Sequence, residues 1–95
     1  MRRRALAVQV EARTQRIGAT MFVSVNARNA DRVPLTLELV TAYGSRTVTG
    51  VAPGSSAYQS FNSRLTSIPA GTVTVKATGV VDGQTVTAQV EAAYT

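Results

Sequence analysis

The sequence predicts an all-β fold in which seven short strands form two packed antiparallel sheets. Three observations support this prediction. Apolar and polar residues alternate with a period of two in one segment after another, as they do in half-buried strands. Glycine-containing turn signals separate the segments roughly every 8–12 residues. Thirteen threonines and many valines among 95 residues also favour strands over helices.

The first half of the chain contains four of these segments, which span residues 6–12, 20–27, 35–40 and 46–51. Each is predicted to bury one face, and the last is a short candidate for an edge strand. The residues expected to point inward are Leu6, Val8, Val10, Ala12, Met21, Val23, Val25, Ala27, Leu35, Leu37 and Leu39. In the second segment, the opposite face carries Phe22, Ser24 and Asn26.

The second half contains the remaining three segments, at residues 56–61, 72–80 and 84–94. The inward residues are predicted to be Ala57, Phe61, Val73, Val75, Ala77, Val86, Ala88, Val90 and Ala92. Asp82 and Gly83 lie between the last two segments. Asp-Gly between alternating runs is a strong hairpin signal, because both central residues of a type I′ turn need positive φ.

Seven such strands are typical of an immunoglobulin/fibronectin-type sandwich. The chain has neither cysteine nor tryptophan, which favours the fibronectin type and excludes a disulfide framework or a thiolate zinc site. We expect residues 5–95 to form the single domain. Residues 1–4, "MRRR", are expected to be a disordered arm or the ragged start of an excised fragment. The apolar run after them is too short for a signal peptide or a membrane span.

Catalytic chemistry is not indicated. There is no histidine, and the five carboxylates are scattered over different strands and loops. They are Glu11, Asp31, Glu38, Asp82 and Glu91. Neither a calcium-binding loop, nor a nucleophile elbow, nor a phosphate-binding glycine loop is present. We therefore predict a protein that is not an enzyme and needs no metal or cofactor.

The segment "SAYQSF" raises the question of a binding surface. Ala57 and Phe61 share the inward phase, which places Tyr58 on the other face with Ser60 and Asn62. Gln59 falls on the Phe61 face, where its amide needs a partner. An exposed tyrosine ring beside polar side chains suits a sugar, whose flat C–H face packs on the ring while its hydroxyls accept and donate hydrogen bonds. The candidate carbohydrate-binding residues are Tyr58, Asn62, Ser60, Tyr43 and Arg46.

The arginines suggest a second feature. In a seven-strand sandwich, the first-to-second, third-to-fourth and fifth-to-sixth connections meet at one end. These connections are expected to contain Arg13, Arg16, Tyr43, Arg46 and Arg64. With a net charge of +5, this end could attract an acidic polymer, although loop arginines also serve only to keep a domain soluble. Nucleic acid is a poorer ligand, because there is no helix for a groove and no aromatic row for bases.

Several of these elements resemble a known family. They are the asparagine-and-aspartate loop before "VP", the "YG" turn, "VAPG", "AYQSF" followed by Arg64, "PAGTVTV" and the final "DG" hairpin. Together, over about residues 8–94, they are similar to the C-terminal accessory β-sandwich of actinobacterial secreted glycoside hydrolases and polysaccharide lyases. Members often carry a cysteine where this chain has Thr14, so no covalent role is expected at that position.

The resemblance implies a secreted, non-catalytic module beside a polysaccharide-degrading catalytic domain in the same parent chain. A plant cell-wall polysaccharide, neutral or acidic, would be its ligand. Two other functions remain open. The module could be a fibronectin-like spacer or docking domain with no ligand of its own, or it could serve in cell adhesion or surface assembly.

Overall fold

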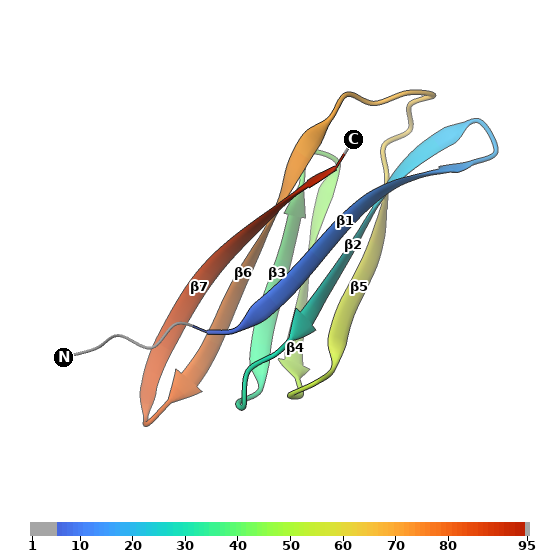
Figure 1. The fold of residues 1–95 in the computed structure, drawn as a ribbon. Coiled ribbons are helices and arrows are strands. Elements are labelled where there is room, and N and C mark those ends of the chain that lie inside the picture. The colour runs from blue at the N-terminus through green and yellow to red at the C-terminus, as the bar shows by residue number, and fades with distance from the viewer. Residues whose placement is uncertain (1–5, 95) are drawn as a thin grey trace.

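A computed structural model describes residues 6–94 (Figure 1). The predicted arm at residues 1–4 lies outside the described residues. Seven strands and no helix are found in the described part of the chain. They are β1 (Val8–Ile17), β2 (Thr20–Asn29), β3 (Leu35–Thr41), β4 (Gly44–Val51), β5 (Ser56–Asn62), β6 (Gly71–Val81) and β7 (Gln84–Tyr94).

The strands form two sheets that pack face to face. The three-stranded sheet has the order β1-β2-β5, and the four-stranded sheet has the order β4-β3-β6-β7. Every neighbouring pair is antiparallel. The edge strands β1 and β7 run beside each other on one side of the sandwich (Figure 1). The predicted seven-stranded sandwich is therefore confirmed.

The core consists of the inward residues of both sheets, as the alternation predicts. The inward side chains of β2, β3 and β6 are almost completely buried, because these strands have neighbours on both sides; Met21, predicted to point inward near the start of β2, is only half-buried. The fully buried apolar residues are Val23, Val25, Ala27, Leu35, Leu37, Leu39, Val73, Val75 and Ala77. The inward residues of the edge strands β1 and β7 are half-buried. Inward burial thus decreases toward the edge strands β1 and β7, whereas the inward residues Ala57 and Phe61 of the edge strand β5 stay buried.

The loop between β2 and β3 is held by a buried polar network. Asn29 is fully buried, and its Nδ2 donates to the carbonyls of Val33 at 2.8 Å and Val51 at 2.9 Å. Its Oδ1 accepts from the backbone N–H of Asp31 at 2.9 Å. The Asp31 carboxylate in turn accepts from the N–H of Ala7 at 2.8 Å. These two polar residues therefore fix the loops at one end of the sandwich.

The last hairpin has the predicted turn. Val81 and Gln84 are paired, so that Asp82 and Gly83 are the two loop residues. Their φ angles are 53° and 77°, both in the left-handed region. A type I′ turn requires this pair of angles. The turn lies at the same end as the β2–β3 loop (Figure 1).

The connections at the opposite end differ from the prediction in one respect. The three expected connections do meet there (Figure 1). However, Arg13 and Arg16 lie within β1 and Arg46 lies within β4, not in loops. Strand β1 continues to Ile17 because its hairpin with β2 extends past the end of β5, whose pairing stops at Phe22 and Asn62. Both faces of this extension are largely exposed, so the alternation that marks a strand disappears.

Candidate functional site

The three-stranded sheet turns one face away from the core, and this outer face carries the candidate site. Cross-strand pairing aligns its residues in rows of three, one from each of β1, β2 and β5. The rows are Gln15–Phe22–Asn62, Arg13–Ser24–Ser60, Glu11–Asn26–Tyr58 and Gln9–Arg28–Ser56. Ten of these twelve side chains are neither aromatic nor aliphatic, so the face offers many hydrogen-bonding groups around Tyr58 and Phe22.

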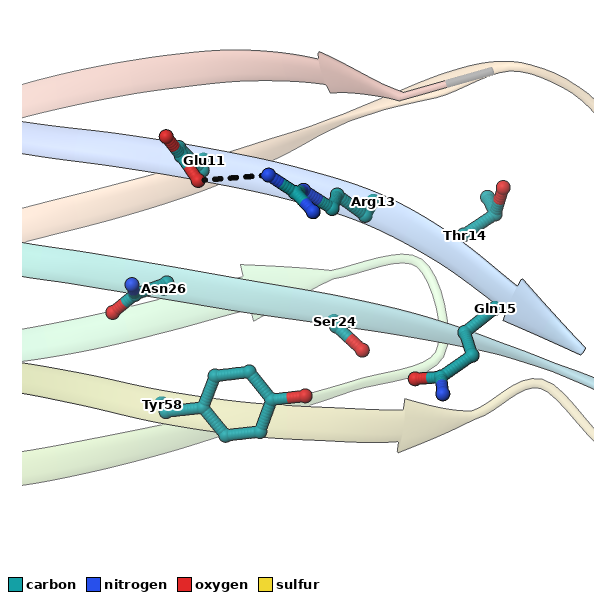
Figure 2. A pocket seen from close by; sticks show the side chains of 7 residues that line it. All are labelled: Glu11, Arg13, Thr14, Gln15, Ser24, Asn26 and Tyr58. Carbon is teal, nitrogen blue, oxygen red and sulfur yellow. Dashed lines mark ion pairs between the residues drawn. The ribbon is translucent and has the colours of Figure 1, made fainter. Parts of the chain in front are cut away.

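A groove of about 530 Å³ runs over this face (Figure 2). Its volume lies within the range of roughly 300–1,000 Å³ that is usual for small-molecule sites. Hydroxyl, amide and charged groups line it together with one aromatic ring. The lining residues are Glu11, Arg13, Thr14, Gln15, Ser24, Asn26 and Tyr58. All three strands of the sheet therefore contribute to the groove.

Tyr58 lies on the outer face, as the alternation predicts. Its side chain is 58% exposed, whereas Ala57 and Phe61 are buried on the other side of β5. The phase of "SAYQSF" is therefore confirmed. Figure 2 shows the ring lying along β5, with its hydroxyl directed toward Ser24 on the neighbouring strand.

A cluster of three hydroxyls holds the Tyr58 ring in this position. The Tyr58 hydroxyl lies 3.0 Å from Ser60 Oγ, and Ser60 Oγ lies 3.1 Å from Ser24 Oγ. Hydrogen bonds from Ser24 and Ser60 lower the pKa of the Tyr58 phenol. Ser24 is only 9% exposed although it belongs to the outer face. The ring is thus fixed by its polar end while its surface stays open to solvent.

Charged side chains of β1 form the opposite wall of the groove. Arg13 Nη2 lies 3.6 Å from Glu11 Oε2, and both side chains remain largely exposed (Figure 2). Such exposed pairs contribute little to stability, about 0–1 kcal/mol. Both groups can therefore exchange this contact for one with a ligand at small cost.

The third predicted residue of β5, Asn62, lies on the outer face in the row of Gln15 and Phe22. Its Oδ1 accepts from the backbone N–H of Arg64 at 2.8 Å, where φ is 61°. This bond stabilises the left-handed Arg64, which lies two residues after the end of β5. Asn62 therefore has a structural contact at the end of the candidate site.

The other two predicted residues, Tyr43 and Arg46, lie away from the groove. Tyr43 is half-buried and packs against the core. It is also close to Tyr94, whose pKa is raised by burial and further by Tyr43. Arg46 Nη1 donates to Gln59 Oε1 at 2.7 Å, and this bond links the edge strands β4 and β5 of the two sheets. The amide oxygen of Gln59, which faces inward, is thus hydrogen-bonded.

Six groove residues were not predicted as carbohydrate-binding residues: Glu11, Arg13, Thr14, Gln15, Ser24 and Asn26. They come from β1 and β2, and they meet Tyr58 only through the register of the sheet. The outward phase of Ser24 and Asn26 was visible in the sequence. The order in which the strands pair was not, so the convergence on Tyr58 could not be deduced.

The predicted cationic end retains two arginines. Arg16 Nη2 donates to the Thr66 carbonyl across 3.4 Å, and Arg64 is exposed in the β5–β6 loop. Exposed Ile17 and Leu65 lie at the same end, with relative exposures of 53% and 47%. This end thus combines positive charge with exposed apolar side chains.

Within residues 6–94, no three histidine, cysteine, aspartate or glutamate residues are grouped so that they could hold a metal ion. The same residues contain no apolar helix of membrane-spanning length. No protein-family model, curated protein or solved structure matches the chain. The chemistry of the outer face is therefore the structural basis for a proposed function.

Proposed function

We propose that this protein is a non-catalytic carbohydrate-binding module and that the outer face of the three-stranded sheet is its binding surface. One observation carries the proposal. The exposed ring of Tyr58 is fixed by Ser24 and Ser60 beside a groove lined with amide, hydroxyl and charged groups. An aromatic platform next to convergent hydrogen-bonding groups is what a pyranose ring requires.

The geometry of the groove fits this chemistry. The C–H face of a sugar ring can pack on the open surface of Tyr58, because the hydroxyl cluster keeps the ring along the sheet. Asn26 lies next to Tyr58 in the same row, and Gln15 reaches toward the groove from β1 (Figure 2). Since the ring is held in place before binding, little side-chain entropy is lost when a ligand docks. A single ring should nevertheless give only weak affinity.

The biological setting of the proposal follows from the resemblance in sequence. We propose that the domain is a secreted accessory module of a polysaccharide-degrading enzyme and that its ligand is a plant cell-wall polysaccharide. The catalytic domain in the same parent chain would then be held near its insoluble substrate. The outer face supports this role because its outward side chains are exposed from Gln9 to Gln15 on β1 and exposed or half-buried from Ser56 to Asn62 on β5, so that it can accept a polymer as well as a small molecule.

Retention of the domain on insoluble xylan and cellulose tests the proposal. The wild-type domain should be retained, and Tyr58→Ala should lose most of this retention. Val80→Ala is a matched control, because Val80 is 60% exposed on the outer side of the four-stranded sheet. Equal retention of the two variants would contradict a role for the Tyr58 face.

A second function, that of a spacer, is favoured by the shape of the domain. The sandwich measures 50 × 22 × 17 Å, and β1 begins at the end opposite to that where β7 finishes (Figure 1). Domains joined through such a unit would be held apart along its long axis. A pure spacer predicts that even the wild-type domain is not retained on any polysaccharide. The same pull-down experiment therefore separates the two functions.

A further inference from the structure

Two arginines flank Tyr58 on the outer face. Arg13 belongs to the row on one side of the Glu11–Asn26–Tyr58 row, and Arg28 belongs to the row on the other side. Successive rows on one face of a strand are about 7 Å apart, so the two arginine rows are separated by roughly 13 Å along the strands. The Tyr58 row thus lies between the two arginine rows, and the Arg13 guanidinium extends back toward Glu11 in the Tyr58 row (Figure 2).

Both guanidinium groups are available to a ligand. Arg13 is paired with Glu11 across 3.6 Å at an exposed position. Arg28 donates to Gln9 Oε1 at 3.5 Å, a long bond on an exposed side chain. A guanidinium carries five N–H donors in a planar fork that matches a carboxylate with two parallel hydrogen bonds. Each arginine therefore has donors to spare for a carboxylate of a ligand.

From this arrangement we infer that the preferred ligand is an acidic polysaccharide whose sugar rings carry carboxylates, that is, a polyuronate. This inference rests on the proposed function and names the class of ligand for the same site. One sugar ring packs on Tyr58, and carboxylates of sugars further along the chain bind Arg13 and Arg28. A neutral polysaccharide would use the ring but would leave both arginines without a charged partner.

Glu11 allows the inference to be tested by whether removing its charge strengthens or weakens ligand binding. Its carboxylate lies in the Tyr58 row and pairs with Arg13, so it both repels an acidic ligand and competes for the guanidinium. Removing its charge should therefore strengthen binding to a polyuronate. If Glu11 instead accepted hydrogen bonds from the hydroxyls of a neutral sugar, the same substitution would weaken binding.

The outer side of the four-stranded sheet provides the control for net charge. Its lysine, Lys76, is paired in register with Glu38, so the cation there has an acidic neighbour. Lys76→Gln and Arg28→Gln lower the net charge of the protein by the same amount. Any effect that comes only from the overall charge must appear equally in both variants.

The test is affinity electrophoresis of the 95-residue chain in gels that contain polygalacturonate or, in parallel, neutral xylan. We expect Arg28→Gln to weaken binding to polygalacturonate by about 2- to 5-fold at low salt, as expected for one exposed charge pair. Glu11→Gln should strengthen it by a similar factor, and Lys76→Gln should leave it unchanged. Tyr58→Ala should abolish binding, and thermal melts should show that all variants are folded.

The possible outcomes separate the inference from the function beneath it. Equal losses for Arg28→Gln and Lys76→Gln, or weaker binding for Glu11→Gln, would overturn the polyuronate inference. Binding to xylan alone, lost in Tyr58→Ala, would also overturn it while leaving the carbohydrate-binding function intact. Failure of the folded wild-type domain to bind any polysaccharide would remove the proposed function itself.

Discussion

The two faces of the three-stranded sheet share one backbone but have different tasks. Phe61 and Tyr58 lie three residues apart on β5, yet Phe61 is 7% exposed and Tyr58 is 58% exposed. On the inner face, large side chains fill the space between the sheets. On the outer face, polar groups surround a single exposed ring. The period of two thus separates residues that stabilise the fold from residues that can serve a ligand.

The polar groups of the two faces differ in the same way. No buried side-chain nitrogen or oxygen of residues 6–94 lacks a hydrogen-bond partner. Asn29, at the end of the inner face of β2, has all of its contacts within the protein. Asn26 lies three residues earlier on the outer face and is exposed. Buried polar groups such as Asn29 are therefore hydrogen-bonded within the protein, whereas Asn26 is exposed in the groove and can contact a ligand.

The largest effect should come from truncating the inner ring. Phe61→Ala is expected to lower the free energy of unfolding by about 3–5 kcal/mol, because it leaves a cavity in the core. Tyr58 lies on the same strand but on the outer face, so Tyr58→Ala should change the free energy of unfolding by no more than about 0.5 kcal/mol. Urea denaturation of both variants measures the difference. Similar losses for the two would mean that the faces are not divided as described.

Asn29→Ala should have the next largest effect. The carbonyls of Val33 and Val51 and the N–H of Asp31 would lose their partner, and we expect a cost of about 2–3 kcal/mol. Asn26→Ala is the matched control, since it removes the same side chain from the outer face of the same strand. Equal unfolding midpoints for the two variants would contradict a structural role that is particular to Asn29.

A smaller effect is expected at the turn that joins β6 and β7. Gly83 has φ of 77°, and a β-branched residue resists positive φ, so Gly83→Val should cost roughly 1–2 kcal/mol. Gly83→Asn should be tolerated better, because asparagine adopts the left-handed region more readily. The difference between the two melting temperatures measures the cost of forcing a β-branched residue into positive φ. An unchanged midpoint in Gly83→Val would show that this angle is not needed.

The smallest change is expected from Tyr58→Phe. The substitution keeps the ring but removes the hydroxyl that contacts Ser60. Stability should stay within about 0.5 kcal/mol of the wild type. Retention on polysaccharide should fall less than in Tyr58→Ala, because the platform remains but is no longer fixed. If Tyr58→Phe and Tyr58→Ala lose retention equally, the hydroxyl rather than the ring makes the important contact.

The sequence was sufficient to predict much of the fold. Inward residues such as Val23, Leu37 and Val75 follow the alternation, because their strands are flanked by neighbours and covered by the other sheet. The Asp82–Gly83 turn was equally clear from its residue types. The extension of β1 to Ile17 was missed, since a hairpin exposed on both faces needs no alternation.

The candidate site was predicted only in part. The phase of β5 places Tyr58, Ser60 and Asn62 on one face, and this much could be deduced from a single strand. The contributions of Glu11, Arg13 and Asn26 depend on which strands are neighbours and on their register, neither of which a local pattern encodes. Tyr43 is half-buried against the core and lies close to Tyr94, which comes from a distant strand. The site residues that depend on strand order and register therefore could not be predicted from local sequence patterns.

The binding of carbohydrate to the outer face of the three-stranded sheet is our central proposal. Its most direct test is an NMR titration of the ¹⁵N-labelled domain with oligogalacturonate and, separately, with a xylo-oligosaccharide. At least one sugar should shift the signals of Arg13, Ser24, Asn26 and Tyr58, while those of Lys76 and Gln89 on the far sheet stay in place. Shifts confined to the four-stranded sheet or to the loop of Arg64, or no shifts with either sugar, would contradict the claim.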